Sequence, residues 1–144
     1  MKGLKWWLCV VGLFYLVEGG GTTLLRLADP EAAAAIWTPT GEPGALDPFA
    51  VEAVLVGSLF ASLSWLVLGV LLLYFTRKPA RAGALVIVVV ALEIFAWMPV
   101  DIVALSYGWP VARGAALLAV HAAIAIGGIL ALRASRAARR AAPA

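Results

Sequence analysis

The sequence predicts an all-α integral membrane protein, folded as an up-down bundle of four transmembrane helices with both termini in the cytoplasm. Four long apolar stretches, few charged residues and a sorting of basic residues to one side favour this class. Hydrophobic residues make up 64% of the chain and charged residues 13%, whereas a soluble domain carries about 25% charged residues. We therefore expect a single transmembrane domain over residues 1–144.

Each apolar stretch is long enough to cross a bilayer, which takes roughly 20 residues in a helix. The spans are expected at residues 4–27, 51–75, 83–105 and 111–132. They leave an outer loop at 28–50 and a basic carboxyl-terminal tail at 133–144.

The first span and its loop contain helix-breaking signals. Glu18 precedes three glycines at 19–21, which weaken a helix and allow close approach of another backbone, so we expect a bend or break there. Asp29-Pro30 marks the end of this helix and the start of a short surface helix near 32–35. Residues 38–44 are rich in Pro, Gly and Thr and are expected to form turns.

The second span has a clear start and a side made of small residues. Asp47 can cap the helix, and Pro48 suits its first turn. Ser58, Ser62 and Gly69 form the small-residue side, and the two serines are expected to bond carbonyls of their own helix.

The third and fourth spans differ in composition. Pro99 removes a backbone donor and is expected to kink the third helix. The fourth carries small residues at four-residue spacing, which predicts a seam of close helix contact. This seam comprises Ala119, Ala123, Gly127 and Ala131.

Basic residues predict the orientation. Nine of the eleven lysines and arginines lie at the termini or in the loop after the second span, and only Arg26 and Arg113 remain for the other side. The positive-inside rule then places both termini in the cytoplasm. We expect a multi-pass protein of a bacterial inner membrane. The net charge of +3 is expected to meet lipid head groups rather than nucleic acid, so the bilayer is the expected partner.

Four ionisable residues lie well inside the spans, where an isolated charge costs about 2.5–3.5 kcal/mol by insertion scales. Arg26, Glu52 and Arg113 lie near the outer ends of their spans. Counting about 1.5 Å of rise per residue puts Glu93 near the midplane, and Glu18, Asp101 and His121 between it and the outer face. The inner half of each span has no such residue. We therefore expect one polar cavity in the outer half of the bundle.

Helical spacing predicts that these groups meet. Glu93, Trp97 and Asp101 recur every four residues and lie along one helix face. A short turn joins the third and fourth spans, so His121 can face Glu93 or Trp97 and form a Glu–His pair. The predicted ligand-binding residues are Glu18, Trp65, Glu93, Trp97, Asp101 and His121.

Purely structural roles are open for the same residues. Glu18 can pair with Arg26 at a helix end, and Asp101 with Arg113 at the outer turn. His121 can be a hydrogen-bonded packing residue in an Ala-rich helix. Trp65 and Trp97 can be lipid-facing or core aromatics. Glu93 is the hardest to explain in this way, because no basic residue of its own helix lies at its depth.

Motifs of known catalytic sites are missing from the sequence. It has no Gly-rich phosphate loop, HExxH, CxxC or GxSxG, and its one cysteine, Cys9, permits no internal disulfide. The spacing of Glu93, Asp101 and His121 is not that of a metal site, so no metal is predicted. The cofactor and any catalytic residues stay unassigned.

Several segments resemble the BphX-like family of small four-helix bacterial membrane proteins. They are Lys5-Trp6-Trp7, residues 14–19, the stretch from Glu93 to Asp101, and His121 followed by Gly127-Gly128. The resemblance covers most of the chain. It implies four spans and, because the family is associated with gene clusters for aromatic-compound breakdown, a lipophilic or aromatic small molecule. It assigns no catalytic residue.

Four functions are open at this point. The first is binding of a small lipophilic ligand (quinone-, isoprenoid- or aromatic-like) in the outer-half cavity, entered at the break near Glu18. The others are proton-coupled transport, acid–base isomerisation by Glu93 with His121 or Asp101, and a role as an accessory subunit. A homo-oligomer is compatible with each.

Overall fold

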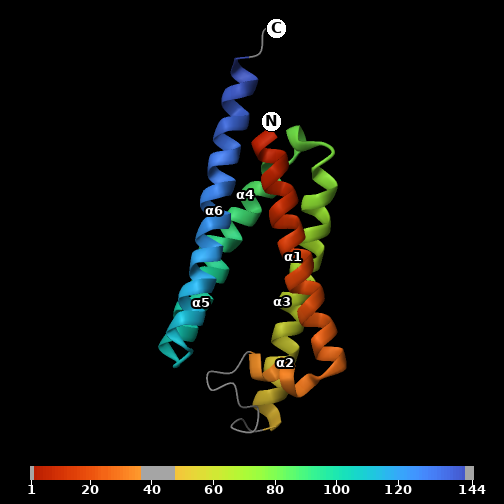
Figure 1. Cartoon of the computed structure of the whole chain (residues 1–144), viewed down its shortest axis with the longest axis vertical. Coiled ribbons are helices and arrows are strands. Elements are labelled where there is room, and N and C mark those ends of the chain that lie inside the picture. The colour runs from red at the N-terminus through yellow and green to blue at the C-terminus, as the bar shows by residue number, and fades with distance from the viewer. Residues whose placement is uncertain (1, 37–47, 142–144) are drawn as a thin grey trace.

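Figure 1 shows the computed structural model, which describes residues 2–36 and 48–141. Helices dominate this part of the chain, and it contains no strand. Four segments in it are long and apolar enough to cross a membrane, as predicted. They are α1 (Lys2–Ala28), α3 (Pro48–Phe75), the continuous segment Gly83–Ser106 and α6 (Val111–Arg140).

Shorter elements complete the described part of the chain. Helix α2 (Pro30–Ile36) follows α1, and the 3-10 turn η2 (Pro79–Arg81) follows α3. The segment Gly83–Ser106 consists of α4 (Gly83–Leu92), the π-helical turn η3 (Glu93–Trp97) and α5 (Met98–Ser106).

The predicted short helix after Asp29 is confirmed. Asp29 Oδ1 accepts a hydrogen bond of 2.9 Å from the Ala32 N–H, and Pro30 occupies the first turn of α2, which is the usual chemistry of a helix start. Helix α3 begins at Pro48 as expected. The predicted cap at Asp47 and the turns at 38–44 lie outside the described residues.

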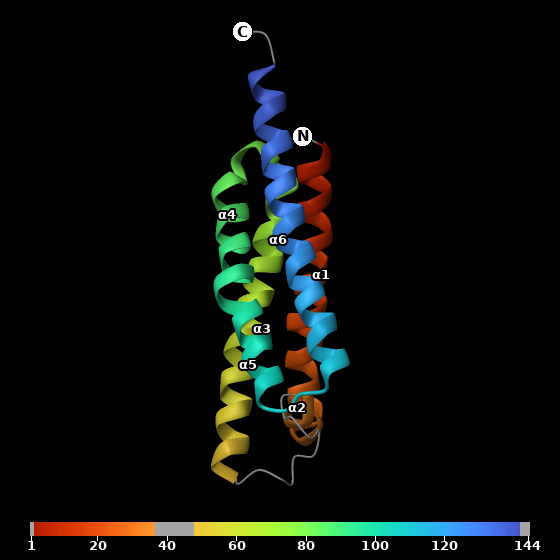
Figure 2. The same cartoon turned by 90° about the vertical axis from the view of Figure 1, so that its left-hand side faces the viewer.

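The bundle has two distinct ends. Figures 1 and 2 show the amino end of α1, the carboxyl end of α6 and the link from α3 to α4 together at one end, here named the terminal end. Helix α2 and the turn between α5 and α6 lie at the other, named the loop end. In Figure 1 the ribbons of α1 and α3 separate from those of α5 and α6 toward the loop end.

Helices α1 and α3 pack through glycines. A Cβ added to Gly19 would lie 2.5 Å from the Ser62 carbonyl oxygen, and one added to Gly69 would lie 2.9 Å from the Gly12 oxygen. Small residues permit this backbone approach, which drives helix association where lipid tails remove the hydrophobic contrast. The small-residue side predicted for the second span is therefore confirmed as a packing face.

Of the bend or break expected in the first helix, the break is wrong. Helix α1 runs without interruption from Lys2 to Ala28. Gly19 lies against the backbone of α3, and the Thr23 hydroxyl donates to the Gly19 carbonyl at 2.7 Å. Gly19 thus serves close packing against α3, while the helical hydrogen bonds continue through the three glycines.

The serines of α3 behave as predicted. Ser62 Oγ donates to the Ser58 carbonyl at 2.7 Å, and Ser58 Oγ donates to the Leu55 carbonyl at 3.2 Å. Their hydroxyl groups are therefore satisfied within the helix, which lets both side chains be buried against α1.

The terminal half of the bundle has an apolar core. Six leucines and valines of this core are at most 4% exposed and come from α1, α3 and α4: Leu4, Leu8, Val11, Leu72, Val86 and Val89. Helix α6 joins this core through Trp7, whose indole Nε1 donates to the Ile124 carbonyl at 3.1 Å.

The small-residue seam predicted for the fourth helix is wrong, because a different face of α6 is the buried one. Ala119 and Ala123 are exposed, and Gly127 and Ala131 are only half-buried. The buried row lies on an adjacent face: Gly114, His121, Ile124, Ala125, Gly128, Leu132 and Ser135. The larger groups of this row, above all His121, decide which face of α6 turns inward.

Replacement of Gly19 by Ala is expected to destabilise the protein. The added methyl would meet the α3 backbone at Ser62 and Leu66, and such overpacking costs about 1–3 kcal/mol, which exceeds the helix-propensity gain of about 1 kcal/mol. Gly21→Ala is the matched control, because nothing lies within 4 Å of its Cβ position. Thermal unfolding in detergent should show a lower melting temperature for Gly19→Ala and an unchanged or higher one for Gly21→Ala. Equal melting temperatures would contradict this packing.

Candidate functional site

The middle of the segment Gly83–Ser106, the third one long and apolar enough to cross a membrane, is wound as a π-helix. The Met98 N–H donates to the Glu93 carbonyl, five residues back, and Pro99 follows with no N–H to give. Wide turns of this kind relieve the lost bond of a proline and are frequent at functional sites. The kink predicted from Pro99 thus takes the form of the wide turn η3, which begins at Glu93.

Glu93 is the most deeply buried charged residue described, with 0% exposure. The Tyr15 hydroxyl of α1 donates to its Oε1, and Nδ1 of His121 on α6 lies 2.5 Å from its Oε2. Both carboxyl oxygens therefore have partners, as a buried carboxyl requires. The Glu93–His121 pair predicted from the sequence is present.

Asp101 extends this arrangement by two helical turns. Its Oδ2 lies 3.4 Å from His121 Nε2, and both side chains are nearly buried. This Oδ2 has no hydrogen-bond partner among the described residues, so the contact is an ion-pair distance without hydrogen-bond geometry. Tyr15, Glu93, His121 and Asp101 are named the acid–imidazole cluster below.

A cavity of about 130 Å³ lies beside the cluster, between the two helix pairs. We name it the tryptophan cavity. Its walls come from α1, α2, α3, α5, α6 and the turns between them: Glu18, Thr22, Ile36, Trp65, Trp97, Val100, Asp101, Ala104, Trp109, Arg113, Leu117 and His121.

Aromatic rings form much of the cavity wall. The rings of Trp65 and Trp97 pack at a centroid distance of 5.1 Å with their planes inclined by 50°, and this contact bridges α3 to η3. The Arg113 guanidinium lies over the Trp109 ring, 4.4 Å from its centroid, a favourable cation–π geometry. The cavity thus offers flat apolar surfaces beside a few charged groups.

Five of the six predicted ligand-binding residues line this cavity: Glu18, Trp65, Trp97, Asp101 and His121. Glu93 lies behind His121 and holds its imidazole. Glu18 is exposed, so it stands at the rim rather than among the buried groups. The predicted convergence of polar residues from three spans is therefore present, and whether they bind a ligand stays a prediction.

The two structural ion pairs considered from the sequence are not formed. The Arg26 guanidinium donates to Ser58 on α3 rather than to Glu18. Asp101 faces His121, and Arg113 lies on Trp109. Both acids thereby remain available to the tryptophan cavity.

The sequence reasoning missed Tyr15, which is fully buried and donates to Glu93. A weak signal exists: Tyr15, Glu18 and Thr22 follow one another at three- and four-residue intervals, so they share one face of α1. Arg113 and Trp109 also line the cavity; the sequence predicted neither as a cavity residue, and it offered Arg113 only a structural role at the outer turn.

The short turn between α5 and α6 fixes the depth of His121. Gly108 adopts a φ of +92°, the Trp109 N–H donates to the Ala104 carbonyl, and the Gly108 N–H donates to Leu105. This is the Schellman pattern, for which glycine is favoured at the left-handed position. Because α6 starts directly afterwards at Val111, its third turn carries His121 to the level of η3.

The chemistry open to this site is polar binding and proton transfer. The cluster holds two carboxyls, an imidazole and a phenol in contact within a membrane-spanning region. Within the described residues, no group of His, Cys, Asp and Glu side chains is arranged to hold a metal ion.

No family model matches the chain, and the searches of curated proteins and of solved structures find no match either. The resemblance to BphX-like proteins therefore stays a prediction.

Removal of His121 is expected to destabilise the protein through Glu93. His121→Ala leaves a buried carboxyl without its partner, which costs about 3–5 kcal/mol. Adding Glu93→Gln removes the charge, so the double variant should lose clearly less stability than the sum of the single variants. Ser135→Ala is the control on the same helix, since its buried hydroxyl has no partner in the described part of the chain. The free energy of unfolding of the two single variants, the double variant and the control is measured by SDS titration in mixed micelles. If the losses of the two single variants simply add in the double variant, the Glu93–His121 pair is contradicted.

Proposed function

We propose that this protein binds a small lipophilic molecule in the tryptophan cavity, with the polar end of the ligand against the acid–imidazole cluster. One observation carries this proposal: an apolar, tryptophan-walled cavity ends on an imidazole that a buried carboxyl holds in place. Ligand sites are typically apolar hollows with a few convergent polar groups.

Burial of the cluster supports a functional role. Charged and ionisable groups inside a membrane are costly and are usually functional. Here they lie beside the cavity, while the other buried side chains described belong to apolar residues and three serines. A purely structural helix contact needs neither a carboxyl at the midplane nor a cavity beside it.

Access to the cavity is proposed beside α1. Glu18 lines the cavity and is exposed at the same time, so its carboxyl marks an opening at the surface. This replaces the route through a broken first helix, since α1 is continuous.

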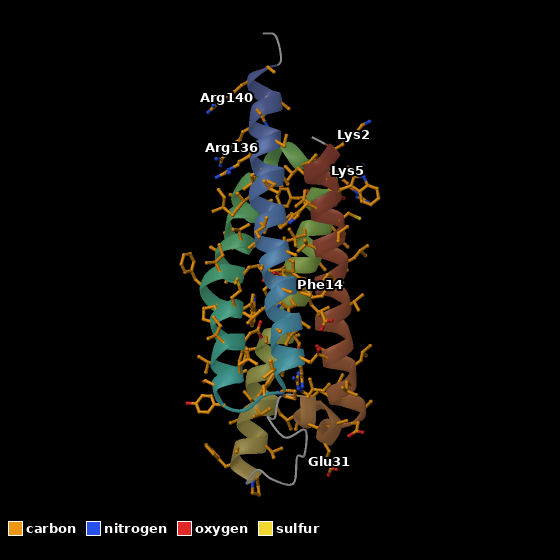
Figure 3. All side chains as sticks on the ribbon, turned by 60° about the vertical axis from the view of Figure 1, so that its left-hand side comes forward. Lys2, Lys5, Phe14, Glu31, Arg136 and Arg140 are labelled. Atoms are coloured by element: carbon orange, nitrogen blue, oxygen red, sulfur yellow. The ribbon has the colours of Figure 1, made fainter. Side chains whose placement is uncertain are left out.

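The proposed setting is a bacterial inner membrane, with an up-down bundle and both termini cytoplasmic. Basic residues support it: Lys2, Lys5, Arg136 and Arg140 extend from the terminal end, whereas Glu31 lies at the loop end (Figure 3). The positive-inside rule orients such a bundle with its terminal end toward the cytoplasm. The tryptophan cavity would then face the periplasmic half of the bilayer.

A second candidate, acid–base isomerisation, rests on the geometry of His121. Glu93 engages Nδ1, which leaves Nε2 toward Asp101 and the cavity. A carboxyl that orients an imidazole in this way is a common arrangement for general base catalysis. In this version His121 takes a proton from a bound substrate and returns it at another carbon, without any cofactor.

Labelling tests the orientation. In a background with Cys9→Ala, a cysteine at exposed Tyr107 should react with a membrane-impermeant maleimide on intact cells. A cysteine at exposed Arg140 should react only after the membrane is opened. The reverse pattern would refute the proposed topology while leaving the cavity intact.

Filling the cavity tests ligand binding. Ala104→Phe places a ring in the tryptophan cavity without changing any charged residue, and it should weaken binding of a lipophilic ligand by about tenfold or more, the factor that about 1.4 kcal/mol represents. Val103→Phe is the control, because Val103 is 52% exposed and lies outside this cavity.

The measurement is calorimetric titration of the full-length protein in lipid nanodiscs with single-ring aromatic compounds, quinones and short isoprenoids. If no compound binds, or if Ala104→Phe binds as the wild type does, the proposed function is wrong.

A further inference from the structure

We infer that the ligand is a neutral single-ring compound with a hydroxyl group, of the phenol or quinol class, whose hydroxyl bridges His121 Nε2 and Asp101. This inference rests on the proposed binding function and names its ligand class. Three features of the site support it: an unbridged polar pair, the size of the cavity and its charges.

The polar pair leaves hydrogen-bonding capacity unused. His121 Nε2 and Asp101 Oδ2 lie 3.4 Å apart, and Oδ2 has no hydrogen-bond partner among the described residues. One oxygen atom can lie about 2.7–3.0 Å from both, which is the normal range of hydrogen bonds. Oδ2 itself is shielded from solvent, so the Asp101 carboxyl must turn slightly toward the incoming group.

A hydroxyl suits this pair better than other polar groups. It can donate its proton to the Asp101 carboxyl and accept a bond from a protonated His121 Nε2. A carbonyl oxygen only accepts and would leave the carboxyl unsatisfied. A hydrocarbon would leave both groups without a partner, which is costly in a buried place.

The cavity volume limits the apolar part to about one ring. The tryptophan cavity holds about 130 Å³, and a dry engineered cavity of roughly 150 Å³ binds benzene. Trp65 and Trp97 supply flat surfaces on which a ring packs well. A fused or branched ligand would need a larger space, although a tail can leave through the opening beside Glu18.

The charges favour a neutral ligand over an anion. Three carboxyl groups, those of Glu18, Glu93 and Asp101, lie in or directly behind the cavity wall. Against them stand His121 and Arg113, and the Arg113 guanidinium already lies on the Trp109 ring. A carboxylate ligand would meet like charge at the bridge position, which costs several kcal/mol across an interface.

The experiment compares phenol, toluene, benzoate, hydroquinone and an alkyl-tailed hydroquinone by calorimetric titration of the full chain in nanodiscs. Phenol is expected to bind about tenfold more tightly than toluene, because a hydrogen bond to a charged group is worth about that factor. Benzoate is expected not to bind. A tailed hydroquinone that binds at least about tenfold more tightly than hydroquinone identifies a membrane quinol, and equal binding identifies a soluble phenol.

Variants locate the hydroxyl. Asp101→Asn should reduce the advantage of phenol over toluene to less than about threefold while toluene binding stays unchanged, because the amide oxygen is a neutral and therefore weaker acceptor for the hydroxyl than the carboxylate. Thr22→Val is the matched control: it removes a different hydroxyl from the cavity wall and should keep the full advantage.

The outcomes separate the two proposals. Equal affinities of phenol and toluene, tight binding of benzoate, or an advantage that survives Asp101→Asn would overturn the hydroxyl bridge. If those compounds still lose affinity in Ala104→Phe, the proposed cavity function stands without it. If none of the five compounds binds, both proposals fail together.

Discussion

The carboxyl of Glu93 is the constraint around which the structure is organised. It lies fully buried in the segment Gly83–Ser106, which is long and apolar enough to cross a membrane, and its two oxygens are taken by Tyr15 from α1 and His121 from α6. A buried acid needs such partners, because hydrogen bonds and an ion pair are what compensate the free energy lost when its carboxyl leaves water. One side chain therefore joins three of the four long helices and fixes the rotation of each.

This constraint divides the bundle into two halves. Toward the terminal end, leucines and valines fill the core, and α1 and α3 meet backbone to backbone at Gly12 and Gly69. Toward the loop end, Trp65 and Trp97 hold the helix pairs together across a cavity. The apolar half supplies the rigidity that keeps the polar groups of the other half in register, as a preorganised site requires.

Much of this arrangement could be predicted from the sequence. The lengths of the spans, the positions of the basic residues and the depth of each polar residue within its span depend only on spacing along the chain. The short turn at Gly108 made the Glu93–His121 contact predictable, since it fixes the relative level of two spans. Rotation about a helix axis could not be predicted in the same way. The partner role of Tyr15, the buried face of α6 and the unbroken path of α1 at Gly19 all depend on packing between distant segments.

The central claim is that His121 is held by Glu93 through Nδ1. His121 is the sole histidine of the sequence, so protein labelled with ¹⁵N-histidine gives the signals of one imidazole in a solid-state NMR spectrum. The account predicts a proton fixed on Nδ1, protected from exchange with water and strongly shifted by Glu93→Gln. An imidazole that exchanges freely between its two neutral forms, and that does not respond to Glu93→Gln, would contradict it.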